Sequence, residues 1–137
     1  MGKPAEALEH IEHALRIKPD YAEAHCNLAL VYARTGRTEE AVRAYEKALQ
    51  LKPDYAEAHC GFGTLLAQTG KLQDAAQHFE EALRYKPDYA EAHNNLGNTL
   101  MLAGRKSDAI THYERALQIK PDFVDAKDNL VRARAAQ

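Results

Sequence analysis

Apolar residues recur every three or four positions along most of the chain, and short clusters of turn-forming residues separate these periodic segments. The spacing predicts amphipathic helices over about residues 3–18, 20–35 and 38–51, with equivalents further along. In the first segment charged residues and histidines fall on the opposite side from the apolar positions, which are Ala7, Leu8, Ile11, Ala14, Leu15 and Ile17. The pattern indicates an all-α protein with eight helices.

One eight-residue sequence, Lys-Pro-Asp-Tyr-Ala-Glu-Ala-His, joins these helices and is repeated. It occupies residues 18–25, 52–59 and 86–93, and an altered copy occupies 120–127. The prolines lie at positions 19, 53, 87 and 121, a constant interval of 34 residues. A fixed period of this size is typical of a solenoid of stacked helical units. We therefore expect a single array over 1–137, with a lone second helix at 3–21, complete repeats at 22–55, 56–89 and 90–123, and a C-terminal capping helix at 124–137.

The repeated sequence also predicts how helices end and begin. Each proline ends one helix, and the aspartate after it is expected to cap the next, with an acid three residues on in a capping-box pattern. The pairs are Asp20 with Glu23, Asp54 with Glu57, Asp88 with Glu91, and Asp122 with Asp125. Gly36, Gly70 and Gly104 are placed to end the first helix of each repeat in a left-handed conformation.

Small and large residues alternate at equivalent positions of the second helices. Two series of alanines accompany one series of aromatic rings, and this alternation lets helices approach closely and interlock. The alanines are Ala41, Ala75, Ala109, Ala48, Ala82 and Ala116, and the rings are Tyr45, Phe79 and Tyr113.

These positions resemble the tetratricopeptide repeat, whose pattern is W-x-x-L-G-x-x-Y, then A-x-x-x-F, then P. The first complete repeat matches with His25, Leu28, Ala29, Tyr32, Ala41, Tyr45 and Pro53, and the next two repeats match in register. Histidine stands at the tryptophan position throughout, where we interpret it as a packing residue. The resemblance implies a right-handed α-solenoid of antiparallel helix pairs, with a concave groove that binds extended or helical peptides.

The resemblance also implies which residues line that groove. The asparagines at 27, 95 and 129 resemble a ladder in the repeats of O-linked N-acetylglucosamine transferases; an amide can pair with both polar groups of a peptide backbone. Asparagine is equally tolerated on any polar helix face, and Gly61 interrupts the ladder. The candidate groove residues are Glu23, Asn27, Leu30, Arg34, Glu57, Thr64, Gln68, Glu91, Asn94, Asn95, Asn98, Asn129 and Arg132.

Composition narrows the classes of partner. Lysine and arginine total 18 against 20 acids, a net charge of −2 with no segregated cations, so we expect no nucleic-acid partner. No apolar run is long enough to cross a bilayer, and the start of the chain lacks the pattern of a signal peptide, so we expect no membrane association and a cytoplasmic location.

No catalytic, metal or cofactor site is predicted. The sequence contains no nucleophile motif or glycine-rich phosphate loop. Adjacent pairs such as His25 with Cys26 diverge by about 100° on a helix. Equivalent cysteines, Cys26 and Cys60, belong to different repeats, so we expect neither zinc ligation nor a disulfide. The chain is predicted to be non-enzymatic.

Three functional alternatives remain. The first is a module that binds a peptide or protein segment in its groove. The second is a scaffold that self-assembles end to end through its exposed N-terminal helix. The third is a substrate-presenting part of a larger enzyme such as a glycosyltransferase. A chaperone C-terminal tail is not expected as ligand, because the carboxylate-clamp positions of that subfamily hold Cys26, Leu30, Gly61, Glu91 and Asn95 here. Starting one repeat later restores one asparagine but no cation.

Overall fold

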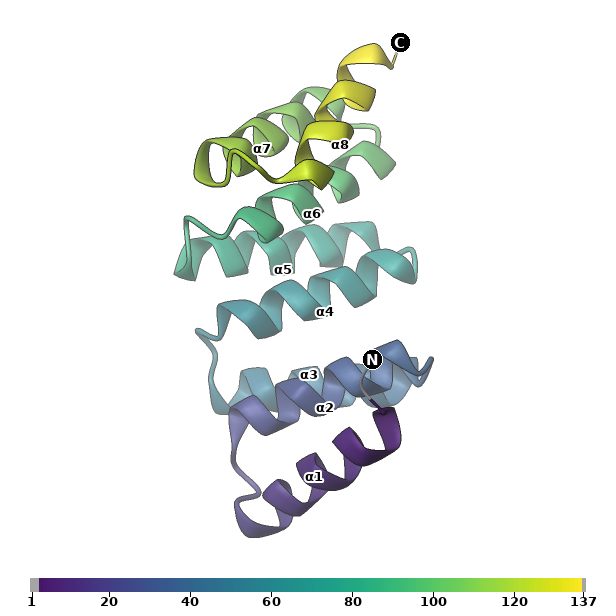
Figure 1. The fold of residues 1–137 in the computed structure, drawn as a ribbon, viewed down its shortest axis with the longest axis vertical. Helices are drawn as coiled ribbons and strands as arrows, with labels where there is room; N and C mark the ends of the chain where they lie inside the picture. The colour runs from purple at the N-terminus through teal and green to yellow at the C-terminus, as the bar shows by residue number, and fades with distance from the viewer. Residues whose placement is uncertain (1–2, 137) are drawn as a thin grey trace.

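The computed structural model describes residues 3–136, which contain eight α-helices and no β-strand (Figure 1). The helices are α1 (Pro4–Ile17), α2 (Ala22–Arg34), α3 (Thr38–Leu51), α4 (Ala56–Gln68), α5 (Leu72–Tyr85), α6 (Ala90–Leu102), α7 (Lys106–Ile119) and α8 (Val124–Ala135). The prediction of an all-α chain is confirmed, with helix boundaries that differ from the expected ones by one or two residues.

Each helix packs against the helices that precede and follow it. The most extensive contacts join α2 to α3, α4 to α5 and α6 to α7, which are the two helices of each repeat. Contacts also join α2 to α4, α4 to α6 and α6 to α8, so the first helices of successive repeats lie side by side. The helices therefore follow one another as a solenoid from α1 at one end of Figure 1 to α8 at the other.

The alternation of small and large residues builds the core. Ala41, Ala75 and Ala109 are fully buried, and the rings of Tyr45, Phe79 and Tyr113 are at most 2% exposed. Burying a large apolar side chain stabilises the fold by roughly 1.5–3 kcal/mol. The rings fit because a first-helix glycine faces two of them. A Cβ at Gly63 would lie 2.9 Å from Phe79, and one at Gly97 would lie 2.6 Å from Tyr113.

The glycine turns inside the repeats have the predicted conformation. Gly36, Gly70 and Gly104 have φ values of 78°, 83° and 80°. At the end of α2, the Arg37 N–H donates to the Tyr32 carbonyl at 2.8 Å and the Gly36 N–H donates to the Ala33 carbonyl at 3.3 Å. This is a Schellman motif, which satisfies carbonyls that the helix end would otherwise leave unpaired.

The predicted aspartate caps are wrong. The N-cap residues of α2, α4, α6 and α8 are aromatic, and none makes a side-chain capping hydrogen bond; they are Tyr21, Tyr55, Tyr89 and Phe123. Each aspartate instead lies in a tight turn before the helix, for example where the Tyr55 N–H donates to the Lys52 carbonyl at 3.1 Å. That turn shifts the helix start one residue beyond the position the capping box requires.

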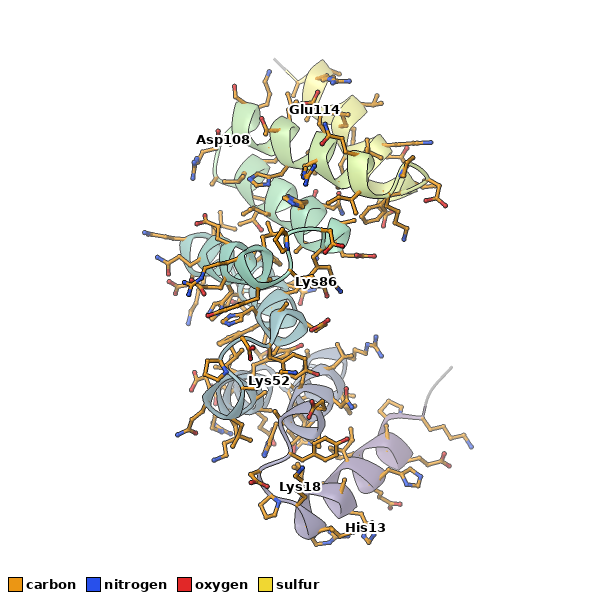
Figure 2. All side chains as sticks on the ribbon, turned by 90° about the vertical axis from the view of Figure 1, so that its left-hand side faces the viewer. His13, Lys18, Lys52, Lys86, Asp108 and Glu114 are labelled. Carbon is orange, nitrogen blue, oxygen red and sulfur yellow. The ribbon has the colours of Figure 1, made fainter. Side chains whose placement is uncertain are left out.

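The lysine before the proline at the end of each complete repeat connects this turn to the first helix of that same repeat. The Lys86 Nζ lies 3.5 Å from a Glu57 carboxylate oxygen and 4.4 Å from the centre of the Tyr89 ring. Lys52 relates in the same way to Glu23 and Tyr55, and Lys120 to Glu91 and Phe123. Lys18, Lys52 and Lys86 lie at successive levels of the stack in Figure 2. Exposed pairs of this kind contribute at most about 1 kcal/mol each to stability.

The last helix has one buried side and one exposed side. Ala126, Leu130 and Ala133 are buried against the array, whereas Val131 is 68% exposed. Arg134 is exposed and forms an ion pair with Glu114 of α7 at 2.7 Å.

Candidate ligand-binding face

The predicted groove residues lie on the surface formed by α2, α4, α6 and α8, which we call the first-helix face. Most of them are exposed, namely Glu23, Asn27, Leu30, Arg34, Glu57, Gln68, Glu91, Asn98 and Arg132. Thr64, Asn95 and Asn129 are half-buried. The Thr64 hydroxyl is turned inward and donates to the Cys60 carbonyl at 3.0 Å.

Asn94 is nearly buried at the edge of this surface. Its side chain is only 5% exposed, at the junction of two repeats, and its Oδ1 accepts a hydrogen bond from Asn129 Nδ2 at 3.0 Å. The same position holds Cys60 in the preceding repeat, which is also 5% exposed. That Asn94 contacts a ligand stays a prediction, and its burial leaves little of the side chain accessible.

Two asparagines of the expected ladder also bond to their neighbours. Asn95 Nδ2 lies 3.4 Å from Thr64 Oγ1, and Asn129 Nδ2 is engaged by Asn94. The Asn129 Oδ1 in turn accepts a hydrogen bond from Arg132. The donor groups of these two amides thus bridge repeats, which limits what they can offer to a ligand.

Gly61, the gap in the ladder, lies against a side chain of the preceding repeat. A Cβ built on Gly61 would lie 2.5 Å from the hydroxyl of Tyr45. A side chain at this position would therefore require the Tyr45 ring to shift. Above it lies an open pocket of about 290 Å³ between α2 and α4, whose lining is mainly apolar and includes Leu30, Ala33 and Leu65.

The opposite end of the face is polar. A pocket of about 380 Å³ between α6 and α8 is lined by Asn94, Asn95, Asn98, Asp125, Asp128, Asn129 and Arg132. Asn98 and Arg132 also border a neighbouring pocket of about 370 Å³. The Tyr113 hydroxyl donates to Asn98 Oδ1 at 2.7 Å, which orients the amide and leaves Nδ2 as the group available to a ligand.

The acidic residues of the face are partly neutralised. Glu23, Glu57 and Glu91 each pair with the lysine described above, at 3.9, 3.5 and 3.7 Å. The glutamates thus form ion pairs and not the capping hydrogen bonds that the sequence suggested. They also lower the net negative charge that a cationic peptide would meet along this edge.

The two cysteines are not arranged as reactive groups. Both are free thiols, Cys60 is buried and Cys26 is half-buried. Burial raises the pKa of each thiol, despite hydrogen bonds from Tyr55 to Cys26 and from Tyr89 to Cys60 that act in the opposite direction. A neutral thiol is a poor nucleophile.

The histidines at the tryptophan position of the repeat pattern form hydrogen bonds as well as packing contacts. His59 and His93 are each 8% exposed, and their Nε2 atoms bond to the carbonyls of Pro53 and Pro87. Their other ring nitrogens face a second histidine on the next helix, His78 or His112. His78 and His112 were not predicted from the sequence, although their recurrence 34 residues apart was a signal that could have revealed them.

Comparison with known protein families identifies the repeat. One tetratricopeptide repeat profile matches residues 60–122, and a second matches residues 1–54 and 20–86. The chain belongs to the tetratricopeptide repeat family. Tetratricopeptide repeats are in general non-catalytic and mediate protein–protein interactions. A search of curated protein sequences found no match.

Solved structures of other proteins share this tetratricopeptide fold. The crystal structure of MamA is 25% identical with a TM-score of 0.83, covering 92% of this chain and 74% of MamA. TTC0263, a thermophilic TPR protein of Thermus thermophilus, is 24% identical with a TM-score of 0.83, covering 95% of this chain and 72% of TTC0263. The first TPR of Spaghetti (RPAP3), solved with the HSP90 peptide SRMEEVD, is 19% identical with a TM-score of 0.80, covering 82% of this chain and 90% of that domain.

Two further observations concern metal binding and membrane spans. Among residues 3–136, no group of three or more histidine, cysteine, aspartate or glutamate side chains is arranged to hold a metal ion. Over the same residues, no helix combines the length and the apolar character needed to span a bilayer.

Proposed function

We propose that this tetratricopeptide array is a non-enzymatic module that binds an extended peptide or protein segment along its first-helix face. The observation that carries the proposal is the amide of Asn98, oriented by Tyr113 and placed beside Arg132. A donor held in a fixed direction on an open surface loses little freedom when a ligand binds.

The α2–α4 end of the face supports a contact with an apolar side chain. The pocket beside Gly61 is lined by aliphatic groups of Leu30, Ala33 and Leu65. Leu30 is 40% exposed, so a ligand side chain placed there would cover apolar surface that now faces water.

The α6–α8 end supports a contact with the peptide backbone or a carboxylate. Asn98 Nδ2 can donate to a carbonyl oxygen, and Arg132 adds a cationic donor to the same pocket. The acceptor oxygen of Asn95 extends this polar row, and Asn27 offers a separate amide at the α2 end. The proposed ligand is a segment that combines an apolar anchor with polar backbone contacts.

The HSP90 peptide bound to the Spaghetti domain is not proposed for this chain. The positions that would clamp a terminal carboxylate hold Cys26, Leu30, Gly61, Glu91 and Asn95, which supply no cation. Asn98 and Arg132 are not at these clamp positions. They would therefore contact a ligand at a different place along the face.

The test begins with an unbiased peptide array probed with the purified protein, followed by calorimetry on the strongest binder. Asn98→Asp keeps the acceptor for Tyr113 and removes the donor, so affinity should fall about tenfold, or ~1.4 kcal/mol. Arg132→Ala should weaken binding to a similar extent. The double variant Asn95→Ala/Asn129→Ala should weaken binding less, because both amides already bond within the array.

Matched controls come from the outer surface of α3. Glu46→Ala and Lys47→Ala change exposed residues away from the first-helix face and should leave affinity unchanged. Equal affinity of the wild type and the Asn98 and Arg132 variants would contradict the proposal, provided that circular dichroism shows the same helicity for all of them.

A further inference from the structure

Two histidine pairs lie between the first and second helices of successive repeats. The Nδ1 atoms of His59 on α4 and His78 on α5 are 3.1 Å apart. Those of His93 on α6 and His112 on α7 are 3.0 Å apart. In the repeat before them, Ala44 stands at the position of the second histidine, so His25 has no such partner. The chain thus carries two copies of the pair and one natural version without it.

The outer nitrogen of the first histidine fixes its tautomer. His59 Nε2 lies 2.9 Å from the Pro53 carbonyl oxygen, which can only accept a hydrogen bond, so Nε2 carries the proton. The Nδ1 of the neutral His59 ring then carries no proton, so it can only accept a hydrogen bond, and it faces His78. A metal-ligating histidine typically has the same arrangement, with its other N–H donated to a backbone carbonyl.

The separation of the two inner nitrogens is close to that of two ligands on one metal ion. Zinc binds histidine nitrogen at about 2.0–2.1 Å with tetrahedral geometry, which places two such ligands roughly 3.3–3.4 Å apart. The observed 3.1 Å requires a small opening of the pair. His78 must also move its proton from Nδ1 to Nε2, and its partial exposure gives solvent access for that exchange.

The charges around the two pairs differ. Asp74 lies one helical turn before His78, and Glu81 lies one turn after it. Burial and the neighbouring His59 ring lower the pKa of His78, and the two carboxylates act in the opposite direction. Glu81 also pairs with Arg84 at 3.4 Å, so Asp74 is the main source of negative charge beside the ring.

The second pair has a less favourable environment. Asp108, the counterpart of Asp74, is held by Arg105 in an ion pair at 2.7 Å. Arg115 occupies the position of Glu81, and its charge helps to lower the pKa of His93, which burial lowers first. Two arginines near His93 and His112 oppose a further cation.

We propose that His59 and His78 form a binding site for a divalent transition metal ion such as zinc. The two Nδ1 atoms are the protein ligands, since no third group converges on the pair in the described residues, and Asp74 supplies negative charge one helical turn away. Water completes the coordination. The ion would join α4 to α5 and so stabilise the middle repeat.

The experiment is zinc titration of chelator-treated full-length protein by calorimetry, with thermal unfolding in zinc and in chelator. His78→Ala reproduces the arrangement of the first repeat, where Ala44 is buried, and is therefore expected to fold. The wild type and His112→Ala should bind one equivalent and melt at a higher temperature in zinc. His78→Ala should bind at least about tenfold more weakly and show no shift, and Asp74→Asn should weaken binding about tenfold.

Two further measurements keep the proposal open to refutation. Long-range nitrogen–proton spectra should place zinc on the Nδ1 atoms of His59 and His78, with protons on both Nε2 atoms. The double variant His10→Ala/His13→Ala removes the exposed histidines of α1 and should bind zinc as the wild type does. Loss of binding in that variant, or equal binding by His78→Ala and His112→Ala, would overturn the proposal.

Discussion

Tyr45, Phe79 and Tyr113 occupy equivalent positions, yet each ring affects the first-helix face differently. Phe79 ends beneath Gly63 and has no polar group, whereas the Tyr113 hydroxyl bonds to Asn98. The Tyr45 hydroxyl reaches the position of Gly61 in the next repeat. The same spacing relates Tyr113 to Asn129, so a tyrosine at this position is compatible with an asparagine in the next repeat.

Gly61→Asn should destabilise the protein, because the new side chain would collide with the buried Tyr45 ring. Overpacking of this kind costs about 1–3 kcal/mol. Tyr45→Phe removes the closest atom, so the double variant should recover part of the loss. Urea denaturation of the two single variants and the double variant gives the coupling energy. Strictly additive effects would contradict the proposed contact.

Two kinds of turn end the helices, one inside each repeat and one between repeats. The glycine turns inside the repeats follow from local backbone chemistry, and they were predicted correctly. The turns between repeats were predicted incorrectly, because a tight turn places an aromatic residue at the N-cap and leaves the aspartate outside the helix. The lysine of this turn pairs with a glutamate 29 residues earlier, which local pattern cannot reveal.

Gly70→Ala tests the glycine turn that ends α4. No atom lies within 4 Å of a Cβ at this position, so the cost comes from the backbone conformation alone. With φ at 83°, alanine should destabilise the protein by about 1–2 kcal/mol, and Gly70→Asn should cost less. Thermal or urea unfolding measures both. Equal stability of the alanine variant and the wild type would show that the turn can adopt another conformation.

Across the whole array, the buried histidines make stability depend on pH. Burial is the largest cause that lowers the pKa values of His78, His93 and His112 below 6.5. The unfolded chain therefore binds more protons than the folded chain just below that pH. The neutral rings therefore contribute stability at pH values above 6.5. That contribution is lost as the pH falls from 6.5 towards the lower pKa values that the histidines have in the folded protein.

We expect the free energy of unfolding, measured in metal-free buffer with urea, to be lower at about pH 5 than at about pH 7.5. The variant His78→Ala/His112→Ala lacks one ring of each pair and should show a weaker dependence over this range. An identical dependence in the variant and the wild type would assign the effect to other groups.

The amino-acid sequence by itself determined the helices, the 34-residue repeat, the left-handed glycines and the buried alanine and aromatic series, because each follows from local periodicity or backbone conformation. It also indicated most of the exposed residues of the first-helix face. Only the tertiary structure decided that Asn94 is buried, that the glutamates pair with lysines, that the Tyr45 hydroxyl lies beside Gly61, and that histidines face each other. These features depend on how closely neighbouring helices pack, which no single helix specifies.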